Sequence, residues 1–67
     1  MDRAKIGKKL KSLRLAKGMT QIETAEKLHV SQSAVNAYET GSRTPRDEVK
    51  LEYSRLFGVP IQTIFFE

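Results

Sequence analysis

The stretch TQIETAEKLHVSQSAVNAYETG, residues 20–41, decides how this chain folds. Apolar residues recur at helical spacing on both sides of Leu28-His29-Val30-Ser31, yet this short segment contains neither Gly nor Pro. A single helix through it would need apolar residues near positions 31 and 32, where Ser31 and Gln32 are polar. Ser is also a preferred N-cap residue. The sequence therefore predicts two short helices joined by a tight turn at His29.

Each of these two helices has its own start and stop signals. Thr20 and Glu23 have the spacing of a capping box, in which each side chain bonds the other residue's backbone N–H. Gly41 is expected to end the second helix in the left-handed conformation. His29 is expected to need a positive φ at the turn, which a His tolerates at some cost in stability. The predicted buried sides are Ile22, Ala25 and Leu28 in one helix and Ala34, Val35 and Tyr38 in the other.

Further helices are predicted on either side of this pair. Upstream, Asp2 is the expected N-cap of a lysine-rich helix that stops at Gly18. Downstream, Thr44-Pro45-Arg46-Asp47 reads as a second capping box with Pro at the first helical position, and this helix stops at Gly58. Pro60 opens a last short helix. The apolar stripes are Ile6, Leu10 and Leu13, then Val49, Tyr53, Leu56 and Phe57, then Ile61, Ile64 and Phe65.

Length and composition narrow the classes of function. A chain of 67 residues is one domain at most, here residues 1–67, and strand signals are nearly absent, so the class is all-α. With no Cys and one His, the chain lacks the ligands of a structural zinc site. It has no membrane-spanning run and no secretory signal, which favours the cytoplasm. No phosphate loop or nucleophile motif is present, so we expect neither an enzyme, nor a cofactor, nor a small-molecule ligand.

The charge is unevenly distributed along the chain. Residues 1–18 carry seven basic side chains and one acidic one, while the remainder has a net charge of −2. The overall charge of +4 suits a polyanionic partner, of which nucleic acid is the commonest. A solvated lysine-rich helix on an ordinary small domain would explain the same charge equally well. Charge alone therefore does not decide the function.

Residues 20–45, TQIETAEKLHVSQSAVNAYETGSRTP, resemble the helix-turn-helix of the Xre family, which includes the lambda-type phage repressors and Cro. Ala25 matches the small residue where the two helices cross, and YETG with RTP matches the family's aromatic-Glu-x-Gly and following Pro. With LRLAKGMTQ before it and LFGVPIQTIF after it, the resemblance covers nearly the whole chain. It implies a compact five-helix lambda-repressor-like domain with its helix-turn-helix at about residues 21–40. The chain departs from the family at His29, Thr24, Asp47 and Lys50.

The resemblance also implies a DNA-binding site. The third helix, about residues 32–40, would enter the major groove of double-stranded DNA and place base contacts at Gln32, Ser33, Asn36 and Ala37. Phosphate contacts are expected at helix N-termini and in the loop after the third helix, at Thr20, Gln21, Ser31, Arg43 and Thr44. The family's ion pair between the first and third helices corresponds to Arg14 and Glu39.

Repressors of this type usually bind inverted-repeat operators as dimers. Blocking polymerase is the simplest mechanism for such a regulator, and activation through a polymerase contact is the alternative. We therefore expect a sequence-specific regulator, a repressor acting as a homodimer, in a prokaryotic or phage-encoded, nucleoid-associated setting. Its dimer contact is expected at Ile64, Phe65 and Phe66. The alternatives are that Phe65 and Phe66 simply close the monomer core, or that the chain is an excised fragment whose missing part forms the dimer. The main alternative is an antitoxin-type module that sequesters a protein partner. An RNA-binding module would need exposed aromatic rings, most of which are expected to be buried.

Overall fold

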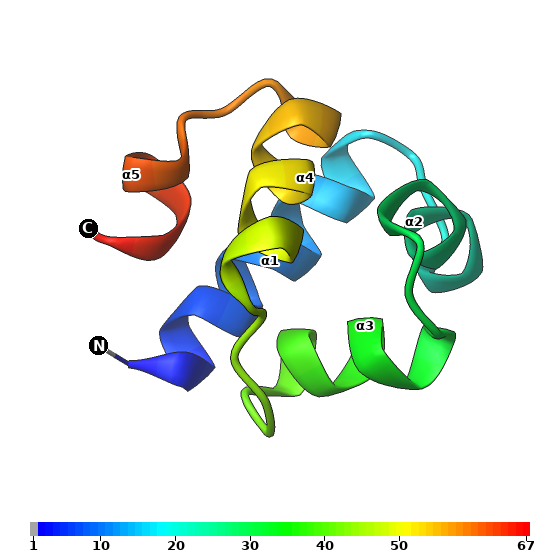
Figure 1. Ribbon diagram of the computed structural model, residues 1–67, viewed down its shortest axis with the longest axis horizontal. Helices are drawn as coiled ribbons and strands as arrows, with labels where there is room; N and C mark the ends of the chain where they lie inside the picture. The colour runs from blue at the N-terminus through cyan, green and yellow to red at the C-terminus, as the bar shows by residue number, and fades with distance from the viewer. Residues whose placement is uncertain (1) are drawn as a thin grey trace.

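The computed structural model describes residues 2–67, and in this range it contains α-helices and no strand (Figure 1). Helix α1 contacts α3 and α5, α2 contacts α3 and α4, and α4 contacts α5. The predicted all-α, five-helix fold is confirmed. The helices are α1 (Arg3–Ala16), α2 (Gln21–Leu28), α3 (Gln32–Thr40), α4 (Asp47–Phe57) and α5 (Ile61–Phe65).

Local hydrogen bonds start the first three helices as the sequence predicts. Asp2 Oδ1 accepts from the backbone N–H of Ala4, at 3.0 Å. Thr20 and Glu23 form the reciprocal capping box, with bonds of 3.1 and 2.9 Å. The bonds from Thr20 also hold the pKa of the Glu23 carboxyl below its ordinary value, because they favour the charged form. Ser31 Oγ accepts from the N–H of the residue three positions on, at 3.1 Å, so each of these helices begins where its cap predicts.

The turn between α2 and α3 has the predicted left-handed residue. His29 has φ 59° and ψ 41°, and it is the single non-Gly residue with positive φ among residues 2–67. The N–H of Val30 then bonds the carbonyl of Ala25 at 3.0 Å, which closes the turn. Val30 packs against the core from this corner. The chain thus changes direction without a glycine.

Replacing His29 with Gly is expected to raise the melting temperature by about 3–6 °C. Gly removes the strain of the left-handed conformation, and this gain exceeds the cost of the extra entropy that Gly gives to the unfolded chain. The imidazole is exposed, so little packing is lost. Thermal unfolding followed by circular dichroism measures the change. The control is His29→Ala, which removes the imidazole but keeps the strained Cβ and should not melt higher than the wild type. A Gly variant that melts lower would mean that the imidazole stabilises the fold through a contact.

The core shows one error in the predicted pattern of α2. Ile22 is 56% exposed, whereas Thr24 is fully buried. Thr24 lies one turn before Leu28 and shares its face, but Ile22 lies about 120° away from Leu28 around the helix. The predicted inward position of Ile22 is therefore wrong. The buried apolar core consists of Ile6, Leu10, Ala25, Leu28, Ala34, Val35, Tyr38, Val49, Tyr53, Ile64 and Phe65.

The predicted second capping box is also wrong. Helix α4 begins at Asp47, its N-cap is Arg46, and no side chain bonds the cap. Arg46 is extended, with ψ 166°, and Pro45 before it is buried in the loop. Thr44 therefore lies two residues too early to cap the helix. The acidic side chains of the first turn instead face the positive end of the helix dipole.

The C-terminal aromatic residues divide between the core and the surface. Ile64 and Phe65 are each 1% exposed, so they close the monomer core and are not free for a dimer contact, as α5 packs against α1 and α4. Phe66 is 52% exposed. The ammonium of Lys50 lies 5.0 Å from the centre of the Phe66 ring and 5.6 Å from that of Phe65, which explains how α4 carries a buried lysine at this position.

Candidate nucleic-acid interface

Helix α3 exposes the side on which base contacts were predicted. Gln32, Ser33 and Asn36 are exposed and Ala37 is half-buried. They lie together because the opposite side of α3 faces the core through Ala34, Val35, Tyr38 and Glu39. The structure thus brings the four residues onto one surface. Their contact with bases stays a prediction.

The residues predicted to hold phosphates lie at helix starts and in one loop. The oxygens of Thr20 and Ser31 accept bonds from their own helices, which leaves each hydroxyl hydrogen to donate outward. The side chains of Arg43 and Thr44 are exposed in the loop between α3 and α4. The backbone N–H of Arg43 bonds the carbonyl of Ala37 at 3.2 Å, which ties this loop to α3. Donors of this kind suit phosphate oxygens.

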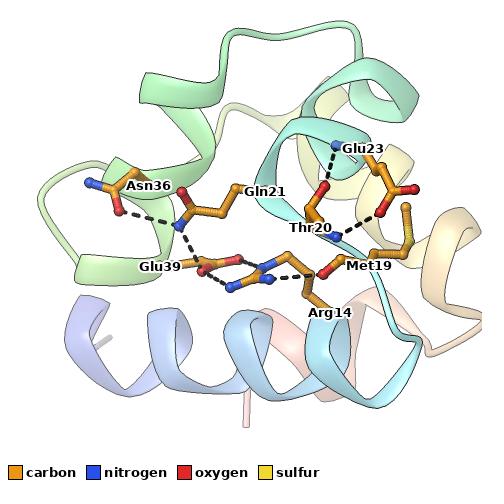
Figure 2. Close-up of polar contacts among 7 residues, drawn as sticks. All are labelled: Arg14, Met19, Thr20, Gln21, Glu23, Asn36 and Glu39. Atoms are coloured by element: carbon orange, nitrogen blue, oxygen red, sulfur yellow. Dashed lines mark hydrogen bonds and ion pairs between the residues drawn. The ribbon is translucent and has the colours of Figure 1, made fainter.

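The predicted ion pair between α1 and α3 is present and buried (Figure 2). Arg14 Nε donates to Glu39 Oε2 at 2.6 Å, and Nη2 donates to Oε1 at 3.0 Å. The two side chains are 9% and 3% exposed. The remaining nitrogen of Arg14 donates to the carbonyl of Met19 at 2.9 Å. The bond to Glu39 raises the pKa of the guanidinium above its ordinary value, so this paired form is strongly favoured.

Gln21 joins this ion pair to the exposed face of α3. Its Nε2 donates to Glu39 Oε1 at 3.1 Å and to Asn36 Oδ1 at 3.2 Å. Both amide hydrogens are therefore used within the protein, and a phosphate would meet the backbone N–H of Gln21 rather than its side chain. The sequence contains no sign of these contacts, because the partners lie 15 and 18 residues away. They place the N-terminus of α2 beside the exposed face of α3.

The sequence matches the helix-turn-helix family HTH_3 over residues 10–64. This chain belongs to that family of Xre-type helix-turn-helix proteins. The helix-turn-helix protein is 39% identical over 54 residues to the HTH-type transcriptional regulator ImmR of Bacillus subtilis, covering 81% of this chain and 42% of ImmR. It thus spans less than half the length of that relative.

Two further comparisons cover nearly all of the other protein. The helix-turn-helix protein is 37% identical over 57 residues to the uncharacterized HTH-type transcriptional regulator MJ0272 of Methanocaldococcus jannaschii, covering 85% of this chain and 86% of MJ0272. Its fold matches the crystal structure of the restriction-modification controller protein C.AhdI from Aeromonas hydrophila with a TM-score of 0.88, at 28% identity, over 96% and 97% of the two chains. The predicted family is confirmed, and the chain carries the helix-turn-helix domain of that family.

Among residues 2–67, no group of three or more His, Cys, Asp and Glu side chains is placed to hold a metal ion. In the same range, every helix is too short or too polar to cross a membrane.

Proposed function

We propose that this helix-turn-helix protein binds a specific inverted-repeat operator in double-stranded DNA as a homodimer and represses transcription there. Helix α3 lies in the major groove. The observation that carries the proposal is the grouping of Gln32, Ser33 and Asn36 as exposed polar side chains on the face of α3 that points away from the core. Such a face at the N-terminal part of a helix can reach base edges.

The chemistry of these side chains suits base recognition. The amides of Gln32 and Asn36 each carry a donor and an acceptor, and Ser33 carries a hydroxyl that bonds several bases. The methyl of Ala37 can contact only an apolar group, such as the methyl of thymine. Around this face, Thr20, Ser31, Arg43, Thr44 and the first N–H groups of α2 hold the phosphates and set the register.

The size of the domain is compatible with a homodimer on such an operator. The domain is 26 Å in its longest extent, shorter than the roughly 34 Å between half-sites one helical turn apart. Two copies therefore fit side by side on successive major grooves on the same side of the DNA. The exposed ring of Phe66 offers an apolar contact between the copies. Occupied operators would block polymerase in the cytoplasm, at the nucleoid of a prokaryotic or phage-infected cell.

Selection of bound duplexes from a random DNA pool at near-physiological salt tests this proposal. We expect enrichment of an inverted repeat whose half-site centres lie about one helical turn apart. Enrichment of a single half-site would contradict the homodimer but support sequence recognition by α3. A pool that stays random would contradict sequence-specific binding and favour a protein-sequestering role of the antitoxin type.

Substitutions on α3 test which residues read the operator. Asn36→Ala and Gln32→Ala are each expected to weaken binding by about 1–3 kcal/mol and to relax preference at one base pair, because each amide discriminates between bases. Arg43→Ala is the matched control. It should weaken binding to all sequences alike and reduce the magnitude of the slope of log K against log salt by about 0.9 for each copy, or about 1.8 for the homodimer. If both amide variants fold and keep the wild-type preference, α3 does not read the bases.

A further inference from the structure

The buried carboxylate of Glu39 determines how the amide of Gln21 is oriented. A carboxylate can only accept hydrogen bonds, and Glu39 accepts two of them from Arg14. The group that Gln21 presents to Glu39 Oε1, at 3.1 Å, must therefore be its NH2 group. The opposite orientation would place the carbonyl oxygen of Gln21 against the carboxylate. The ion pair thus selects one of the two amide orientations.

The second hydrogen of this NH2 group determines the orientation of Asn36 in the same way. Gln21 Nε2 lies 3.2 Å from Asn36 Oδ1, and a donor at this position excludes the NH2 group of Asn36. In Figure 2 the oxygen of Asn36 points toward Gln21 and its nitrogen points away from the protein network. Arg14 and Gln21 thus both donate to Glu39, and Gln21 also donates to Asn36.

From these hydrogen bonds, we infer that Gln21 is a positioning residue for base recognition: it holds Asn36 so that the Nδ2 donors face the DNA. The inference rests on the proposed function of α3. Asn36 is exposed and would otherwise sample several rotamers and both amide orientations. Fixing one orientation before binding reduces the entropy that recognition must overcome.

The orientation defines which bases Asn36 accepts. An outward NH2 group bonds the acceptors N7 and O6 of guanine, N7 of adenine or O4 of thymine. The N4 amino group of cytosine is a donor and meets another donor at this point. The base pair read by Asn36 should therefore present an acceptor, and cytosine should be the most strongly rejected base. Gln21 thus acts on specificity without touching a base.

Nuclear magnetic resonance of the free protein tests the orientation independently of DNA. The variant is Gln21→Met, which keeps the length of the side chain and removes both hydrogen bonds. Because Gln21 is half-buried at the first position of α2, the substitution leaves the core intact. We expect the side-chain NH2 resonances of Asn36 to shift and its χ1 couplings to become averaged. Ile22→Met is the matched control on the exposed next position and should leave Asn36 unchanged. An unchanged Asn36 in Gln21→Met would overturn the inference.

Binding to the selected operator tests the consequence for specificity. The measured quantity is the ratio of affinities for the preferred base and for cytosine at the position that Asn36→Ala relaxes. Asn36→Ala should lower this ratio about tenfold, and Gln21→Met should lower it about three- to fivefold. Adding Gln21→Met to Asn36→Ala should cause no further loss of discrimination, because Gln21 acts through Asn36.

The possible failures are distinguishable. If the wild-type chain selects no sequence, the proposed function fails and the inference fails with it. In the other case, a sequence is selected while Gln21→Met weakens binding to every operator variant equally, both alone and combined with Asn36→Ala. Gln21 then acts only on a phosphate contact or on the stability of the fold. In that case the inference is overturned and the proposed function stands.

Discussion

Gly7→Ala is expected to destabilise the protein by about 3 kcal/mol, the upper end of the range for overpacking a well-packed interior. Gly7 is buried in α1 where this helix crosses α3. A Cβ at this position would clash with the carbonyl oxygen of Glu39 and would lie 2.8 Å from that of Tyr38. These atoms are backbone and cannot rotate away, so the two helices would have to separate. Separation would also lengthen the ion pair between Arg14 and Glu39.

The expected loss is large compared with the stability of such a domain. A 67-residue domain has a typical free energy of unfolding of about 3–10 kcal/mol. The greater helix propensity of Ala opposes the clash by at most about 1 kcal/mol. Chemical denaturation followed by far-ultraviolet circular dichroism measures the change. Ser12→Ala, which places Ala at an exposed position of the same helix, is the matched control and should be neutral or stabilising. A Gly7→Ala variant as stable as the wild type would show that α1 and α3 do not cross this closely.

Arg14→Met is expected to cost about 3–5 kcal/mol, because it leaves the carboxylate of Glu39 without its main partner in a buried position. Glu39 is 3% exposed, and its remaining bond is the one from Gln21. The bond from Arg14 to the carbonyl of Met19 is lost as well. The free energy of unfolding from denaturant titration measures the effect. The double variant Arg14→Met/Glu39→Leu should recover most of the loss, because no unpaired charge then remains buried.

The exposed ion pair of α4 provides the control for this prediction. Arg55 Nη1 lies 2.8 Å from Glu52 Oε1, close to the 2.6 Å of the buried pair, but the two side chains are 72% and 37% exposed. Arg55→Met should therefore change the stability by no more than about 0.5 kcal/mol. Equal effects of Arg14→Met and Arg55→Met would contradict the claim that burial gives the Arg14–Glu39 pair its importance.

The proposed interface was partly predictable from the sequence. The outward direction of Gln32, Ser33 and Asn36 follows from the helical period once Val35 and Tyr38 are assigned to the core. The resemblance to a known family supplied the ion pair of Arg14 with Glu39, which the structure contains. The link through Gln21 to Asn36 was not predictable, since it depends on how α2 and α3 lie against each other.

The sequence by itself determined the features that depend on a few neighbouring residues. The caps at Asp2, Thr20 and Ser31 and the left-handed turn at His29 involve bonds that span at most five positions, so the local order of side chains specifies them. The all-α fold follows from these stops and starts together with the apolar spacing between them.

Only the tertiary structure decided which side chains are buried at the edges of each stripe. Thr24 is buried instead of Ile22, α4 starts after Pro45 rather than at it, and Phe65 lies in the core while Phe66 is exposed. In each case the local pattern allows both outcomes. The choice depends on where a second helix or loop covers the surface, and such contacts join residues that are distant in the chain.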